Sequence, residues 1–162
     1  MLVDDALVAE DLGVITEDVL ALKNGFALPG MRVLQFGFDG EPGNVHVPYR
    51  HEPNCVVYTG THDNDTSLGW YAGLDHDTRE RVDFYLRVTP GAMPAALIRA
   101  ALGSVGQLAI IPAQDLLGLG PEARLNTPGT TSGNWIWRLP PGALTPELAR
   151  GCAHLNAAFG RA

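Results

Sequence analysis

Four short apolar runs, separated by stretches with helical character, restrict what this sequence can fold into. The runs cover residues 6–9, 31–38, 55–59 and 107–112. Continuous apolar runs of this length are typical of parallel strands that are covered on both faces. Strands that alternate with helices indicate an α/β layer or part of a (β/α)8 barrel. We therefore predict an α/β fold with about four parallel strands.

The segments between these runs carry signals for helix starts. Thr16 is a typical N-cap, and Asp77 with Glu80 three residues later resembles a capping box. Thr145 followed by Pro146 predicts the start of the last helix. The predicted helices cover residues 16–25, 67–74, 77–86, 92–102 and 145–159.

The composition is that of a single globular domain. Apolar residues make up 46% of the 162 residues and charged residues only 18%, which supports a folded core and argues against disorder. A formal net charge of -7 argues against a nucleic-acid partner and against an anionic membrane surface. The two cysteines, Cys55 and Cys152, indicate no disulfide framework. The start of the chain has no basic segment followed by an apolar one, so we predict a cytoplasmic protein.

Polar side chains follow the predicted strands at the points where these strands end. His62, Asp63 and Asp65 come directly after the run at 55–59, within the polar stretch 59–66. Glu10 follows the run at 6–9, and Asp115 follows the run at 107–112. The carboxyl ends of parallel strands carry the active site in open sheets and in barrels. We therefore predict an active site that contains these side chains.

Two carboxylates from different strands suit glycoside chemistry. Glu10 and Asp63 can divide acid and base roles, because burial and mutual repulsion separate the pKa values of paired carboxyl groups. Retaining glycosidases use such a pair on either side of the scissile bond. The sequence also offers partners for sugar hydroxyls and rings, namely His62, Asn134, Trp135 and Tyr49.

Plainer interpretations of the same residues remain open. Glu10 precedes Asp11 and could be an acid at the start of a helix. Trp135 and Trp137 alternate by two positions, and tryptophans in such a pattern more often anchor a core than stack on a sugar.

A metal site is the weaker alternative. Several side chains supply nitrogen or oxygen donors, namely His46, His51, His62, Asp63 and Asp65. No H-x-x-x-H or C-x-x-C spacing organises them, so a metal-dependent hydrolase is disfavoured. No G-x-G-x-x-G sequence follows a predicted strand, and we predict no cofactor.

Six motifs occur together and in one order along the chain. They are AEDLG at 9–13, LPGM at 28–31, VLQF at 33–36, YTGTHDNDT at 58–66, QDLLGLG at 114–120 and SGNW at 132–135. With this set, the sequence closely resembles the C-terminal part of the catalytic domain of the 4-alpha-glucanotransferases. These enzymes are also called amylomaltases or disproportionating enzymes and form glycoside hydrolase family 77. The resemblance covers almost the whole chain.

This resemblance implies a (β/α)8 barrel enzyme that needs no cofactor. Such an enzyme transfers α-1,4-glucan segments between maltooligosaccharides with retention, and glucose or a maltodextrin is the acceptor. By motif, Glu10 resembles the general acid/base and Asp63 the carboxylate that stabilises the transition state. His62, Asn134 and Asp11 resemble substrate-binding residues.

The chain departs from the family pattern at the nucleophile. The family's nucleophilic Asp lies at the end of an earlier strand, upstream of Met1, and Asp4 and Asp5 are not substitutes for it. A smaller departure is Ile136, where the family commonly has Arg. We therefore expect residues 1–162 to form one half of a barrel, without a second domain. Such a half would be inactive alone, and would self-associate or require a nucleophile-bearing half. The alternative is a non-catalytic fragment or a glucan-binding partner.

Overall fold

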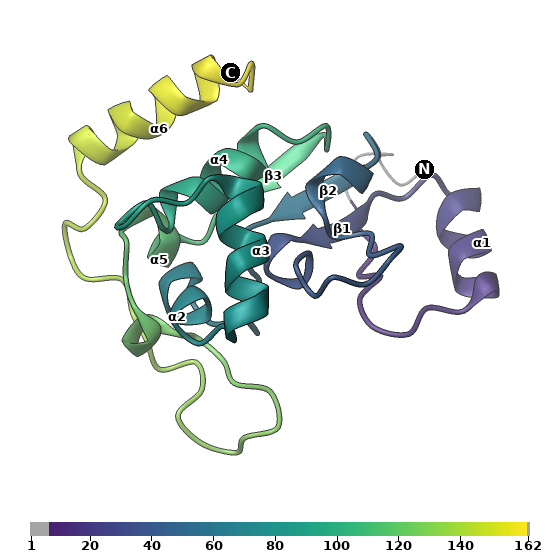
Figure 1. The fold of residues 1–162 in the computed structure, drawn as a ribbon, viewed down its shortest axis with the longest axis horizontal. Coiled ribbons are helices and arrows are strands. Elements are labelled where there is room, and N and C mark those ends of the chain that lie inside the picture. Colours follow the sequence, from purple (N-terminus) through teal and green to yellow (C-terminus); the bar gives the residue numbers. More distant parts are fainter. Residues whose placement is uncertain (1–6, 162) are drawn as a thin grey trace.

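A three-stranded parallel sheet lies at the centre of the computed structural model, which describes residues 7–161 (Figure 1). The strands are β1 (Gly30–Val33), β2 (Cys55–Tyr58) and β3 (Leu108–Ile110), in the order β1-β2-β3. Val33 pairs with Tyr58, and Tyr58 pairs with Ile110, so the three strands end at one edge of the sheet. The prediction of an α/β fold with parallel strands is confirmed.

Residues 7–161 contain six α-helices. They are α1 (Glu17–Gly25), α2 (Ser67–Ala72), α3 (His76–Leu86), α4 (Ala95–Leu102), α5 (Ala113–Leu116) and α6 (Pro146–Ala158). Three short 3-10 segments occur at Leu34–Phe36, Pro48–Arg50 and Pro121–Ala123. All five predicted helices are present, and the one-turn helix α5 was not predicted.

Side-chain caps explain where several helices begin. The Thr145 hydroxyl accepts a hydrogen bond from the amide of Leu148, as predicted for the start of α6. The predicted cap at Asp77 is wrong by two residues. The N-cap of α3 is Asp75, because its carboxylate accepts a hydrogen bond of 2.9 Å from the amide of Thr78.

The first predicted strand, residues 6–9, is not a strand where the structure describes it. Residue 6 lies outside the described residues, and residues 7–9 are extended without being part of the sheet. A single backbone hydrogen bond, from the amide of Ala9 to the carbonyl of Pro29, joins this segment to its neighbour. Leu7 and Val8 are about half exposed rather than buried, at 49% and 45%. One hydrogen bond does not make a strand pair, which needs repeated backbone hydrogen bonds along both segments.

The strand predicted at 31–38 is shorter than expected because the chain turns after Val33. Residues Leu34–Phe36 form a 3-10 turn, and Gly37 follows as its C-cap. A Cβ atom at Gly37 would lie 2.8 Å from the backbone oxygen of His46, so the close approach of these two segments requires glycine. The turn carries Leu34 into the core, where it is fully buried.

The core lies on one face of the sheet. Cys55 and Val57 of β2 point toward the helices and belong to a buried cluster with Val82 of α3 and Leu97 of α4. On the other face, Leu108 of β3 remains 48% exposed. The prediction of strands covered on both faces is therefore wrong for β3, where Leu108 and Ile110 are 48% and 40% exposed. It is correct for β2, where Cys55, Val56 and Val57 are all buried although they alternate between the two faces.

Two helices lie at the margins of the molecule. Neither α1 nor α6 contains a buried residue, and Figure 1 shows them at opposite sides of the sheet. The end of α6 is anchored by Arg161, which donates hydrogen bonds to the carbonyls of Leu102 and Gly106. The described part of the chain contains no helix that is long and apolar enough to span a membrane.

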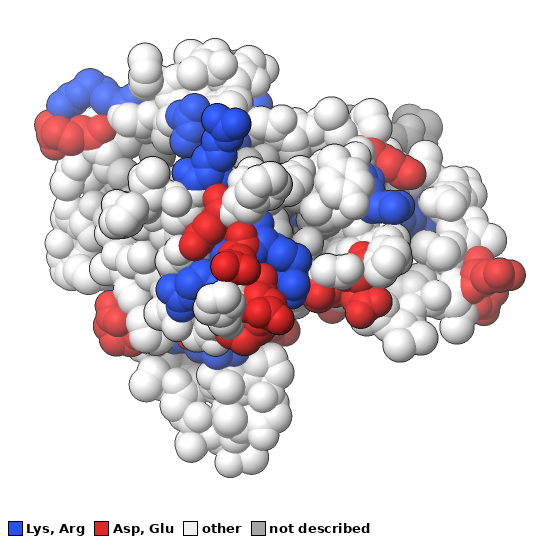
Figure 2. Space-filling model, in the orientation of Figure 1, with Lys and Arg blue, Asp and Glu red and all other residues white. Residues whose placement is uncertain are grey.

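Charges on the surface are mixed in sign over α3. This helix carries acidic and basic side chains next to one another, at Asp77, Arg79, Glu80, Arg81 and Asp83. Figure 2 shows them as an interspersed group rather than as a basic patch. This face therefore offers no field of one sign to a nucleic acid.

Candidate active site

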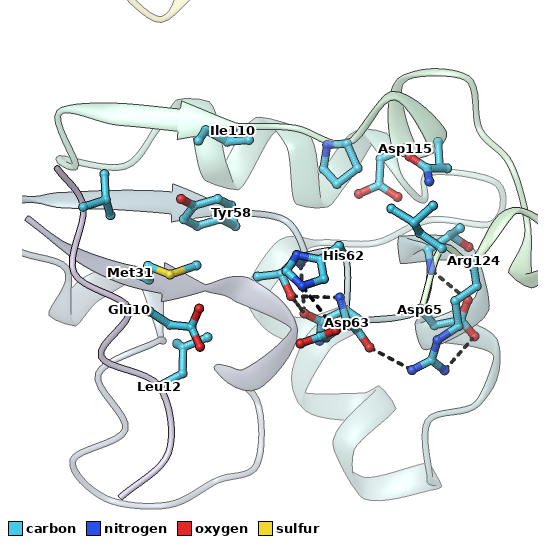
Figure 3. Close-up of a pocket in the computed structure, with 18 residues that line it drawn as sticks. Glu10, Leu12, Met31, Tyr58, His62, Asp63, Asp65, Ile110, Asp115 and Arg124 are labelled. Carbon is cyan, nitrogen blue, oxygen red and sulfur yellow. Dashed lines mark hydrogen bonds and ion pairs between the residues drawn. The ribbon is translucent and has the colours of Figure 1, made fainter. Parts of the chain in front are cut away.

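A cleft of about 440 Å³ lies at the carboxyl ends of the strands (Figure 3). Apolar side chains form part of its wall, namely Met31, Tyr58 and Ile110 from the face of the sheet opposite Cys55 and Val57, and Val8 from the segment before α1. The polar part comes from the loop after β2 and from the segment before α1, with Glu10, His62, Asp63 and Asp65. An apolar wall with a few convergent polar groups is typical of a ligand site.

Glu10 and Asp63 reach the cleft from two different segments. Glu10 is exposed, and among residues 7–161 no side chain or amide donates a hydrogen bond to its carboxylate. The Tyr58 hydroxyl lies nearby. Burial raises the pKa of Tyr58, and the negative charge of Glu10 raises it further. Glu10 and Asp63 thus line the same cleft, although the segment that carries Glu10 is not a strand of the sheet.

His62 lies between Asp63 and Trp135. Its Nε2 is 3.3 Å from Oδ1 of Asp63, and its ring centroid is 5.1 Å from that of Trp135. Trp135 adopts a left-handed backbone conformation, with φ of 62°, and is 52% exposed. The interpretation of Trp135 as a core anchor is therefore wrong, because the loop turns this ring outward against His62.

Two residues that the sequence did not single out hold Asp63. Asn126 donates a 2.6 Å hydrogen bond from Nδ2 to Oδ1 of Asp63. Arg124 donates from Nη2 to the backbone carbonyl of Asp63 at 2.9 Å, and its Nη1 is 4.0 Å from the carboxylate of Asp65. Both lie in the long segment after η3 (Pro121–Ala123), whose lack of periodicity gave no sign of this contact.

Further hydrogen bonds stabilise the conformation of the loop after β2. Oδ1 of Asn64 accepts hydrogen bonds from the amide and the hydroxyl of Thr61. The Gln35 side chain donates to the carbonyl of Asp65 at 3.0 Å. A Cβ at Gly60 would lie 2.6 Å from Nε2 of Gln35, so a larger residue there would displace the side chain that holds Asp65.

Asp11, predicted to bind substrate, does not line the cleft. Its carboxylate accepts hydrogen bonds from Nζ of Lys23, the amide of Met31 and Nη1 of Arg32. A side chain at the neighbouring Gly30 would displace this carboxylate. Burial by itself raises the pKa of Asp11, but the Lys23 and Met31 hydrogen bonds and the Arg32 charge outweigh it and lower the pKa. The structure gives Asp11 a role in joining the segment before α1 to β1.

Asn134, also predicted to bind substrate, braces its own loop. Its Oδ1 accepts from the amide of Thr127 at 2.9 Å, and its Nδ2 donates to the hydroxyl of Thr130. These bonds shape the turn that presents Trp135 to His62. Of the five predicted site residues, Glu10, His62 and Asp63 therefore line the cleft, whereas Asp11 and Asn134 support segments around it.

Two of the histidines named as metal donors have structural partners instead. The amide of Val33 donates to Nδ1 of His46 at 3.2 Å, and Nε2 of His51 is 3.0 Å from the carbonyl of His46. Burial lowers the pKa of both imidazoles. Within residues 7–161, no group of three or more histidine, cysteine or acidic side chains is arranged to hold a metal ion.

Comparison with known proteins identifies the family. The family model described as 4-alpha-glucanotransferase matches residues 3–145. The chain belongs to the 4-alpha-glucanotransferase family. It is 51% identical over 135 residues to the chloroplastic/amyloplastic 4-alpha-glucanotransferase of Arabidopsis thaliana. It is 47% identical over 157 residues to the 4-alpha-glucanotransferase of Synechocystis and 49% identical over 149 residues to that of Thermus thermophilus.

This member of the 4-alpha-glucanotransferase family spans a minor part of each relative. The matched region covers 83% of the chain but 23% of the Arabidopsis protein, 96% of the chain but 31% of the Synechocystis protein, and 87% of the chain but 30% of the Thermus protein.

A solved structure confirms that the similarity extends to three dimensions. The amylomaltase from Streptococcus agalactiae, solved in complex with acarbose, superposes with a TM-score of 0.88 at 32% identity. The match covers 95% of this chain and 32% of that one. The amylomaltase from Corynebacterium glutamicum has the same fold over 96% of this chain and 29% of its own, with a TM-score of 0.65 at 19% identity.

Proposed function

We propose that this chain supplies the acid/base side of a retaining 4-alpha-glucanotransferase that acts on maltooligosaccharides. The observation that carries the proposal is the arrangement of Glu10, His62 and Asp63 around one cleft at the carboxyl ends of the strands. Membership of the 4-alpha-glucanotransferase family supports the reaction class.

Glu10 is the general acid and base in this proposal. Its exposed carboxyl group would protonate the oxygen of the glucosidic bond as that bond breaks. It would then remove the proton from the acceptor hydroxyl in the second half of the reaction. Its exposure suits this role, because among residues 7–161 no hydrogen bond to the Glu10 carboxyl group has to break before that group contacts the substrate.

Asp63 stabilises the transition state in this proposal. Glycosyl transfer passes through an oxocarbenium-like state, and a fixed carboxylate nearby lowers the energy of its positive charge. The hydrogen bond from Asn126 and the adjacent His62 hold the Asp63 carboxylate in one orientation. His62 is also placed to donate to a sugar hydroxyl, and Trp135 offers an exposed ring face beside it.

The nucleophile would come from outside these 162 residues. We propose that residues 1–162 form the C-terminal half of a (β/α)8 barrel and that the face of the sheet opposite Cys55 and Val57 points into it. The exposure of Leu108 and Ile110 on this face supports the proposal, because barrel strands bury such side chains in the interior. Without the other half, the open edges and faces would favour self-association.

The substrate class follows from the same comparison. The Streptococcus agalactiae amylomaltase was solved with acarbose, and we propose that the cleft here binds related α-linked glucosides. Maltooligosaccharides would be donors, and glucose or a maltodextrin would be the acceptor. The proposal involves no nucleic acid and no membrane.

A complementation experiment tests this proposal. The chain is incubated with maltotriose, alone and together with a fragment of the Synechocystis relative that ends where the similarity to this chain begins. We expect glucose and longer oligomers only from the mixture. Product from the chain alone would contradict the missing nucleophile, and no product from an associated mixture would favour a non-catalytic glucan-binding partner. Acarbose binding by the associated but inactive mixture would support that second function.

A further inference from the structure

Asp115 is a buried carboxylate in the wall of the cleft. It lies in α5, directly after β3, and is 2% exposed. Oδ2 accepts hydrogen bonds of 2.6 Å from the hydroxyls of Thr59 and Ser67, and Oδ1 accepts one of 2.8 Å from the amide of Ser67. Within residues 7–161, no basic side chain lies within ion-pair distance of it.

The two partners of Asp115 are the two ends of one loop. Thr59 is the first residue after β2, and Ser67 is the first residue of α2. The segment between them carries His62 and Asp63. One carboxylate therefore closes the base of the loop whose tip lines the cleft.

The cost of burying this group indicates a specific role. A buried carboxylate destabilises a fold unless donors satisfy its oxygens, whereas an apolar side chain of similar size would fill the same space without that requirement. Here three donors from two separate elements converge on Asp115. Such a network restricts the distance between the end of β2 and the start of α2.

The loop is thereby held on two sides. Asp115 fixes its base, and Arg124 and Asn126 hold Asp63 at its outer side. Neither contact alone would define the position of the Asp63 carboxylate, because the loop could pivot about the other.

We propose that Asp115 is a positioning residue that sets the place of Asp63 relative to Glu10. This inference rests on the proposed function for its consequence in glucan transfer, but the closure of the loop is a property of the chain itself. Asp115 touches no substrate in this proposal and acts through Thr59 and Ser67.

Two variants and one control separate positioning from general stability. Asp115→Ala removes all three hydrogen bonds, whereas Asp115→Asn keeps an oxygen for the amide of Ser67. Val82→Ala weakens the core on the far side of the sheet and serves as the control. All are compared at a temperature at which circular dichroism shows each of them fully folded.

Amide hydrogen exchange measures the loop directly in the 162-residue chain. We expect Asp115→Ala to speed exchange at residues 61–66 by about tenfold or more, because it removes the hydrogen bonds that join the two ends of the loop. Asp115→Asn should increase the exchange rate of these amides less. Val82→Ala should leave the ratio between the exchange rate at residues 61–66 and the exchange rate in β2 unchanged. If amide exchange at residues 61–66 in Asp115→Ala is as slow as in the wild-type chain, the proposal is overturned.

Transfer from maltotriose, in the mixture with the Synechocystis fragment, measures the consequence. Small displacements of a reacting group cost about 100-fold in rate, so we expect Asp115→Ala to lower kcat by about that factor and to change KM much less. Asp115→Asn should recover most of the loss. An equal fall of kcat in Val82→Ala would overturn the positioning role. If wild type itself gives no transfer, the proposed function fails, while the exchange data still decide whether Asp115 closes the loop.

Discussion

The Asn126 side chain donates a 2.6 Å hydrogen bond to Oδ1 of Asp63, although the two residues lie 63 positions apart. The same oxygen is 3.3 Å from Nε2 of His62. One carboxylate oxygen thus joins the loop after β2 to the long segment after β3. The other oxygen remains available to a ligand, which is the arrangement that a carboxylate facing a developing positive charge requires.

Asn126→Ala should weaken acarbose binding without unfolding the chain. The pair is exposed, so little stability is lost, but Asp63 loses the donor that fixes its orientation. We expect a rise in Kd of about 5- to 10-fold, equivalent to one hydrogen bond of about 1 kcal/mol, by isothermal titration calorimetry. Asn156→Ala on α6 is the matched control and should bind like wild type. Equal binding by both variants would show that Asn126 does not orient Asp63.

Asp11→Asn should lower stability at neutral pH and lose this effect in acid. The folded-state pKa of Asp11 is lowered, so its ionised form stabilises the fold above the unfolded value of about 3.9. This contribution disappears as the pH falls through the lower folded-state pKa. We expect urea denaturation at pH 7 to show a loss of about 1–3 kcal/mol. The difference in free energy of unfolding between wild type and Asp11→Asn should become smaller below about pH 4. A difference that stays constant down to about pH 2 would be inconsistent with the ion pairs from Asp11 to Lys23 and Arg32.

The buried His51 and the half-buried His46 should make the fold sensitive to mild acid. Burial lowers the pKa of His46 and His51, so the unfolded chain binds more protons than the folded one as the pH falls through about 6.5. Stability is fully present above that value and falls toward the lower folded-state pKa values. Thermal denaturation at pH 7.5 and 5.5 should show this loss, and His46→Gln should reduce it. A melting temperature that rises on acidification would contradict the burial of neutral imidazoles.

Leu97→Ala should lower the free energy of unfolding more than Leu108→Ala, because the two leucines lie on opposite faces of the sheet. Leu97 is fully buried among the helices, and its truncation should cost about 2–5 kcal/mol. Leu108 is 48% exposed in β3, so its truncation should cost much less in the isolated chain. Urea denaturation measures both. Equal losses would mean that another surface covers Leu108, for example in a self-associated form, which sedimentation would then reveal.

The sequence predicted the parts of the fold that local chemistry decides. Local patterns correctly predicted the Thr145 cap of α6, the strand at Cys55–Tyr58 and the polar loop that follows this strand. His62 and Asp63 line the cleft as predicted because they follow β2 at its carboxyl end, whereas Glu10 reaches the cleft from a segment that is not a strand. The motifs then identified the family, which the comparisons confirm.

What the sequence did not predict depends on contacts between distant segments. The pairing partners of residues 7–9 and the covering of β3 depend on what packs against them, and an apolar run has the same pattern in either case. Asp11 stands beside Glu10 but turns to Lys23 and Arg32, which its position in the motif does not reveal. Asn126 and Arg124 lie in a loop without periodicity, so their contacts with Asp63 appear only in three dimensions.

The role of Glu10 is the central claim, and one rate comparison tests it most directly. The chain with Glu10→Gln is mixed with the Synechocystis fragment, and transfer from maltotriose is measured beside the matched surface variant Glu80→Gln. Loss of a general acid costs about 100- to 10,000-fold, so we predict a fall of that size for Glu10→Gln and the wild-type rate for Glu80→Gln. Wild-type transfer by Glu10→Gln would contradict the account.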